Sequence, residues 1–123
     1  MNEQIATEET DRLIASNKVE GTKVFGRDGE KLGTITNFMV GKLDGQVEYA
    51  VLEFGGLLGV GTDYYPVPWD VLDYDTEQGG YVVNLDKDQL KEAPRYVKDA
   101  APAYDHAYGR EVHDYYDVEY PYV

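Results

Sequence analysis

The chain has 123 residues, the length of one domain with short tails, and its 24 acids against 11 bases give a formal net charge of −13. This charge excludes a nucleic-acid backbone as a general partner, because phosphate binding needs clustered Lys and Arg, and it disfavours anionic lipid surfaces. Without cysteine, the chain has no disulfides, thiolate catalysis or Cys-ligated zinc. It shows no signal peptide or membrane span, so we expect a cytoplasmic protein without direct membrane insertion.

The first half of the chain predicts short strands joined by tight turns. It opens with a polar segment at residues 1–12, before the pattern of strands begins. Strands are expected at residues 22–26, 31–40 and 46–54, with hairpin turns at Asp28-Gly29 and Asp44-Gly45. The last of these strands becomes apolar on both faces, which is typical of a strand that enters a closed core.

A glycine-rich stretch follows the third strand and raises the question of a phosphate-binding loop. Its glycines are Gly55, Gly56, Gly59 and Gly61. The dinucleotide pattern fails because Tyr64 stands where its third glycine belongs, and no Gly-Lys-Ser/Thr sequence completes a Walker motif. A proline-containing segment comes next rather than a helix, so no helix N-terminus is available to hold a phosphate. We therefore interpret the glycines as a tight bend between strands.

The segment after the bend predicts an edge strand, a final strand and a short helix. Pro66 and Pro68 cannot donate ladder hydrogen bonds, which places the strand at 64–72 at an edge or a bulge. A last strand is expected at 81–85. Asp86 and Gln89 then have the spacing of a capping box, and Pro94 ends the helix.

The last 26 residues, 98–123, form an acidic tail that holds half of the tyrosines and shows no stable period. We expect this tail to be mobile. A second interpretation stays open, in which the aromatic residues let the segment fold on a partner or on another copy of the chain.

Several possible catalytic or metal-binding patterns are incomplete. Asp73, Asp75 and Glu77 alternate, but a calcium loop counted from Asp73 lacks its glycine and its final carboxylate. His106 and His113 lie seven residues apart and could share a helix face, yet Gly109 weakens that helix. Ser16, the single serine, has no nucleophile motif around it. We therefore expect no enzyme, no catalytic residues, no cofactor and no metal site.

Residues 13–97 resemble the PRC-barrel family, which is named for the cytoplasmic barrel of the photosynthetic reaction centre H subunit, and in particular its stand-alone bacterial members. The resemblance rests on "GTKVFGRDGEKLGTITNFMV", "GQVEYAVLEFGGLLGVG", "YYPVPWDVL" and "GGYVVNLDKDQL", which follow one another in this order. It implies an all-β fold, a small PRC-type β-barrel of five to six short strands followed by one short C-terminal helix. It also implies an adaptor or assembly module without family-wide catalytic residues.

We therefore expect a non-catalytic protein-interaction module that binds a protein partner or a second copy of itself. The candidate interaction surface is the proline-containing edge with its aromatic neighbours, namely Tyr64, Tyr65, Pro66, Pro68 and Trp69. The alternative is a barrel that binds a small ligand or a metal ion at the acidic and aromatic rim of residues 64–77. A purely structural interpretation is that Trp69 and the paired tyrosines belong to the core and rim of the barrel.

Overall fold

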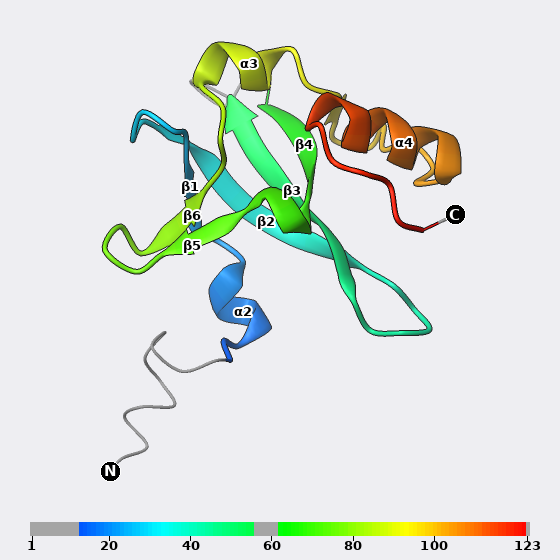
Figure 1. The fold of residues 1–123 in the computed structure, drawn as a ribbon, viewed down its shortest axis with the longest axis horizontal. Helices are drawn as coiled ribbons and strands as arrows, with labels where there is room; N and C mark the ends of the chain where they lie inside the picture. Colours follow the sequence, from blue (N-terminus) through cyan, green and yellow to red (C-terminus); the bar gives the residue numbers. More distant parts are fainter. Residues whose placement is uncertain (1–12, 56–61, 123) are drawn as a thin grey trace.

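The computed structural model describes residues 13–55 and 62–122, and it contains one seven-stranded sheet with helices around it (Figure 1). The strands are β1 (Lys23–Phe25), β2 (Lys31–Val40), β3 (Val47–Gly55), β4 (Thr62–Pro68), β5 (Asp73–Asp75), β6 (Gly80–Val82) and β7 (Tyr96–Val97). The helices are α2 (Ser16–Val19), α3 (Lys87–Lys91) and α4 (His106–Tyr115), with a 3-10 turn, η2, at Trp69–Val71. The order β5-β6-β1-β2-β3-β4-β7 leaves β5 and β7 at the two ends.

The sheet is built from antiparallel hairpins closed by glycine turns. The β1–β2 turn contains Gly29 at φ +86° and the β2–β3 turn contains Gly45 at φ +72°, both in the left-handed region that glycine enters at no steric cost. Both hairpins predicted from Asp-Gly pairs are confirmed. A parallel pair, β1 with β6, makes the sheet mixed.

The core of the sheet is mainly aliphatic and lies between the strands and α3. Ile35, Leu52 and Leu90 are at most 1% exposed and belong to one cluster of buried side chains. Rings surround this cluster, with Trp69 packed against Phe38 at 5.7 Å between ring centroids. Burying each large aliphatic side chain contributes about 1.5–3 kcal/mol, which makes this cluster the main source of stability for the sheet.

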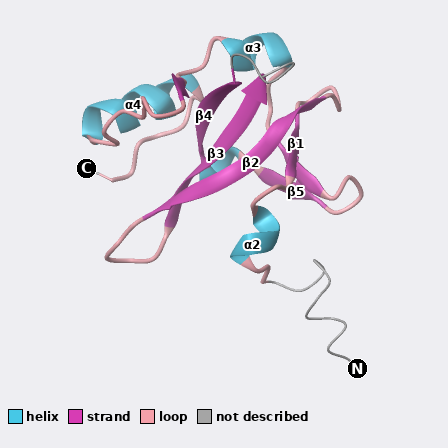
Figure 2. Ribbon diagram, turned by 180° about the vertical axis from the view of Figure 1, so that it is seen from behind, coloured by secondary structure: helices cyan, strands magenta, loops and turns pink. Residues whose placement is uncertain are grey.

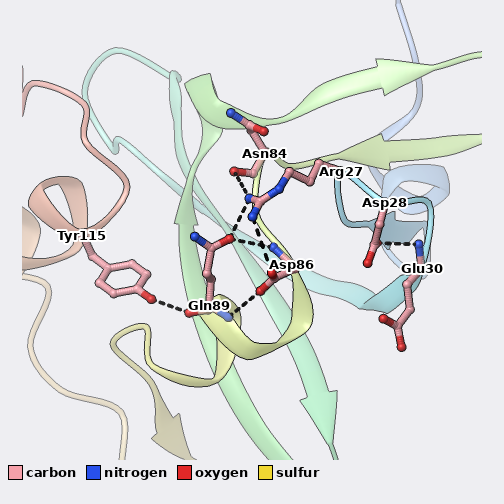
Figure 3. A network of polar contacts seen from close by, with 7 residues as sticks. All are labelled: Arg27, Asp28, Glu30, Asn84, Asp86, Gln89 and Tyr115. Carbon is pink, nitrogen blue, oxygen red and sulfur yellow. Dashed lines mark hydrogen bonds and ion pairs between the residues drawn. The ribbon is translucent and has the colours of Figure 1, made fainter.

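Helix α3 begins with the predicted capping box and is tied to the first hairpin. The Asp86 carboxylate accepts a hydrogen bond from the Gln89 amide at 2.9 Å, and the Gln89 side chain accepts one from the Asp86 amide at 2.9 Å. Arg27, in the β1–β2 turn, donates to Gln89 Oε1 at 2.6 Å and lies 3.4 Å from Asp86 Oδ2 (Figure 3). The hairpin turn and α3 are therefore held in one polar network.

Helix α4 is the largest difference from the sequence-based expectation. The Asp105 carboxylate caps it by accepting a hydrogen bond from the Tyr108 amide, and Val112 and His113 are buried on its inner face. Figures 1 and 2 show α4 lying beside β4. The sequence showed no stable hydrophobic period here because α4 has no aliphatic stripe of its own. Aromatic rings from other segments of the chain cover the helix instead. The expected mobility of residues 98–123 stays a prediction, and hydrogen exchange measures it.

The expected all-β class with five to six strands and one short helix needs correction: the chain is mainly β, with seven strands and three α-helices in the described residues. Sequence analysis missed β5 and β7, because pairs of two or three residues have no recognisable period. The strand expected at 64–72 ends at Pro68, where the 3-10 turn begins. The polar segment 1–12 and the glycine bend at 56–61 lie outside the described residues.

Candidate binding groove beside the C-terminal helix

A cleft of about 830 Å³ lies between helix α4 and the segment that carries the end of α3 and strand β7. We call this cleft the acidic groove. Its charged lining residues are Asp63, Glu92, Arg95, Glu111 and Asp114, and its aromatic lining residues are Tyr96, Tyr108 and Tyr115. A volume of this size is within the range of sites that bind small molecules or peptide side chains.

The charge of the acidic groove is unbalanced, because its single cation is already engaged. Arg95 Nε lies 3.5 Å from Asp63 Oδ2, and Arg95 Nη1 donates to the Lys91 carbonyl at 2.9 Å. Within the described residues, Glu92, Glu111 and Asp114 have no ion-pair partner. Their carboxylates therefore leave the groove strongly negative and available to a cation.

Two tyrosines fix the walls of the groove to the rest of the fold. Tyr115, near the end of α4, donates a short hydrogen bond to the Gln89 carbonyl of α3 (Figure 3). Tyr96, in β7, shares a 2.9 Å hydroxyl–hydroxyl hydrogen bond with Tyr104, just before α4. The helix is thus held on both sides of the cleft, so the groove needs little ordering before it can bind.

Tyr108 presents a phenol with an unused hydrogen-bonding oxygen. Its hydroxyl is buried and has no hydrogen-bond partner among the described residues. Burial raises the pKa of Tyr108 to about 12, with smaller contributions from Tyr96 and Glu111. The phenol is therefore neutral at physiological pH, and protein atoms cover its oxygen.

The five residues of the predicted interaction surface lie together along β4 and η2, but mostly on the inside. Tyr65, Pro66 and Pro68 are buried, whereas Tyr64 and Trp69 are partly exposed. Strand β4 pairs with β3 along its length and with β7 at Asp63 and Tyr64, and α4 contacts it. The strand is therefore the last but one in the sheet order and not an edge strand, although beyond Tyr64 its proline-containing part pairs with no other described strand on the side of β7. Its role as an interaction surface stays a prediction.

At the acidic end of the rim of residues 64–77, Asp75 stabilises the turn between β5 and β6. The Asp75 carboxylate accepts hydrogen bonds from the Glu77 amide at 2.9 Å and from the Gln78 side chain at 3.0 Å. These hydrogen bonds lower the pKa of Asp75. Across residues 13–55 and 62–122, no three His, Asp or Glu side chains gather closely enough to hold a metal ion.

The two histidines share α4, as their spacing suggested. His113 is buried and donates from Nδ1 to the Gly109 carbonyl at 2.8 Å, and His106 Nδ1 forms a 2.8 Å hydrogen bond with the Tyr120 hydroxyl. Both rings pack edge-on against Tyr120. These contacts give the histidines a structural role in holding the end of the chain on α4.

Sequence reasoning missed the acidic groove because one of its two walls, formed by α4, belongs to the tail that showed no period. One local signal was available: Asp105 stands three residues before Tyr108, which is the spacing of an N-cap. From such a cap, Tyr108, Val112 and Tyr116 follow at intervals of four and share one helix face. The other wall comes from residues 92–97, and a contact this distant in sequence leaves no local pattern.

No helix in the described part of the chain has the length and apolar content needed to cross a membrane. Among curated proteins, the chain is 30% identical over 81 residues to an uncharacterized protein of Deinococcus radiodurans, a match that covers 66% of this chain and spans only 28% of that relative. Among solved structures, it is similar to a 16S ribosomal RNA processing protein, RimM, of Pseudomonas aeruginosa. That match has 20% identity and a TM-score of 0.38, and it covers 61% of this chain and 45% of the other.

The family assignment rests on a separate comparison. The family model described as PRC-barrel domain matches residues 11–90, a span that includes every strand of the sheet except β7 and ends within α3. Most of the acidic groove, including all of α4, lies beyond the matched span. The chain therefore belongs to the PRC-barrel family, and it carries a C-terminal helix outside the matched domain.

Proposed function

We propose that this PRC-barrel protein is a non-catalytic interaction module whose binding surface is the acidic groove. The observation that carries the proposal is an open cleft with unpaired carboxylates and fixed tyrosine walls. The sequence motifs, in contrast, contain no complete nucleophile, cofactor loop or metal-ligand pattern. Binding without chemistry is the use of such a surface that these residues support best.

The test is affinity capture from a native lysate of the source organism with the full-length chain immobilised, followed by mass-spectrometric identification. We expect specific protein partners that remain bound at about 0.15 M salt, where weak long-range attraction to an acidic surface is screened. Light scattering on the same preparation reports self-association. A strictly monomeric chain that retains no protein would contradict the proposal.

The alternative function, small-ligand or metal binding at residues 64–77, has weaker support. Asp75 is engaged in its own turn, and Trp69 packs between Phe38 and Tyr81 with ring centroids 5.7 and 5.5 Å away. A thermal-shift panel of metal ions and metabolites tests it. A ligand at a hundred times its Kd should add about 2.7 kcal/mol to the free energy of unfolding, so binding would be plainly visible.

A further inference from the structure

We propose that the acidic groove receives an arginine or lysine side chain from an extended, basic segment of the partner protein. This inference rests on the proposed interaction function and specifies the chemistry of the partner. The argument starts from charge: Glu111 and Asp114 on α4 and Glu92 beyond α3 line one cleft, and none has an ion pair within the described residues. A cation is the complementary ligand.

Aromatic walls make the groove more specific than an acidic surface alone. Tyr96, Tyr108 and Tyr115 line the same cleft as the carboxylates. Ring faces attract guanidinium and ammonium groups, and the planar guanidinium can also stack on them. A carboxylate beside a tyrosine ring therefore offers a cationic side chain both an ion pair and a stacking surface, which a solvated acidic patch does not.

Tyr108 contributes its ring to the groove rather than its hydroxyl. Protein atoms cover the phenol oxygen, so a ligand in the open cleft does not reach it. Guanidinium carries five N–H donors in a fixed fork, so it can donate to a groove carboxylate while its plane lies against a tyrosine ring.

The surroundings of the groove favour an extended segment over a free small cation. Strand β7, which forms one wall, is the last strand in the sheet order, and its outer edge pairs with no other described strand. Val97 in this strand is 52% exposed and would be covered by a chain that lies along the edge. Extended segments bind at such edges, with side-chain pockets providing the specificity.

The probe for the test is a fluorescein-labelled peptide of glycine and serine that carries two arginines, compared with the same peptide carrying citrulline in their place. Binding is measured by fluorescence polarisation at about 0.15 M salt. The groove variant combines Glu111→Gln with Asp114→Asn. The matched control combines Glu20→Gln with Glu119→Gln, two exposed acids that do not line the groove, and has the same net charge. Circular dichroism verifies that both variants fold.

We expect the arginine peptide to bind the unmodified chain and the control equally, and to bind the groove variant at least tenfold more weakly. Tyr108→Phe should leave binding nearly unchanged, because it removes the covered hydroxyl and keeps the ring. The citrulline peptide should not bind. Equal weakening by both double variants would mean that the overall charge attracts the peptide, and it would overturn the proposal, as would no binding at all. Free arginine that binds as tightly as the peptide would overturn the choice of an extended segment.

Repeating the lysate capture with the same two double variants separates this inference from the proposed function. Partners lost from the groove variant and kept by the control would support both. Partners retained equally by both variants would leave the interaction module standing and overturn the acidic groove as its basic-segment site. A monomeric chain that retains no partner from the lysate would contradict the interaction module itself, whatever the peptide shows.

Discussion

The sheet and the layer formed by α4 are both well packed, but different side chains hold them. In the sheet, buried aliphatic residues such as Ile35, Leu52 and Leu90 fill the core. Around α4, Val112 is the buried aliphatic residue of the helix, and rings make most of the remaining contacts. Tyr49, for example, meets Tyr104 and His113 edge-on, at 5.3 and 5.5 Å between centroids.

Because of this difference, we expect different changes to destabilise the two regions. Aliphatic packing depends on filled volume, so the sheet should be most sensitive to lost side-chain atoms. Ring packing depends on direction and on neutral hydroxyl groups, so the α4 layer should also respond to pH and to small steric changes. Variants in each region test this expected difference between the sheet and the α4 layer.

Leu90→Ala should give the largest loss of stability. Leu90 is 0% exposed and links α3 to the core of the sheet, and truncating such a residue costs about 2–5 kcal/mol. Urea denaturation followed by circular dichroism measures the change. Leu43→Ala is the control, because Leu43 is fully exposed in the β2–β3 turn and should change stability by less than about 0.5 kcal/mol. Similar losses in the two variants would mean that α3 is not packed on the sheet.

Val112→Ala should cost less, about 1.5–2 kcal/mol, because it removes two buried methyl groups. Val112 is 0% exposed, and its loss should also lower the hydrogen-exchange protection of the other α4 amides. The comparison variant is Val40→Ala, a valine that is about half exposed. If residues 98–123 form a mobile tail, Val112→Ala will leave both stability and exchange unchanged, so this experiment decides between a packed and a mobile tail.

Alkaline pH should weaken the α4 layer before it affects the aliphatic core. Burial raises the pKa of Tyr108 to about 12, and burial together with the hydrogen bond between the Tyr104 and Tyr96 hydroxyls raises the pKa of Tyr104 as well. The folded-state pKa of Tyr108 lies above the unfolded value, so folding favours the neutral phenol. The contribution of this neutral phenol to the free energy of unfolding is complete below pH 10. It is lost as pH rises through about 12.

Tyrosinate absorbance recorded together with circular dichroism checks this prediction. We expect exposed phenols to ionise first and a later group to ionise together with loss of helix signal. Tyr104→Phe is the informative variant, because it keeps the ring and removes one late-ionising hydroxyl. A single ionisation step near the ordinary tyrosine value would show that the phenols around α4 are solvated.

The sequence predicted the sheet well because its signals are local. Asp28-Gly29 and Asp44-Gly45 set two turns, the strand at 31–40 was placed at its observed bounds, and the Asp86–Gln89 capping box begins α3. Each signal depends on neighbours within a few residues. The very short strands β5 and β7 escaped, since their pairing partners rather than their own residues decide that they are strands.

The acidic groove was beyond this kind of reasoning. Its two walls are formed by residues 92–97 and by α4, and α4 is held in place by contacts such as that of Tyr115 with Gln89 of α3, 26 residues away in sequence. Tyrosines in an acidic, proline-containing tail also resemble the composition of disordered segments. What distinguishes them here is ring-to-ring packing, such as that of Tyr104 against Tyr49 in β3 and Tyr96 in β7, which no periodicity reports.

Gly109→Ala should have the smallest net effect on the free energy of unfolding. Its structural effect should be confined to the packing of Tyr120 on α4. Alanine favours a helix over glycine by about 1 kcal/mol, which should strengthen α4. Its Cβ, however, would lie 2.4 Å from Cε1 of Tyr120, so the ring must leave its position on the helix. The Tyr120 hydrogen bond to His106 and its edge contact with His113 would then be lost. The two effects should nearly cancel in the free energy of unfolding.

A double-mutant cycle with Tyr120→Ala resolves the two contributions. Once the ring is gone, Gly109→Ala should stabilise the chain by the full propensity gain of about 1 kcal/mol. In the unmodified chain the same change should give almost no gain and should raise hydrogen exchange at residues 118–122. Equal stabilisation in both backgrounds would show that Tyr120 does not rest on Gly109. The ring contacts would then not be what holds residues 118–122 on α4. In that case ring packing would not distinguish this part of the α4 layer from the aliphatic sheet.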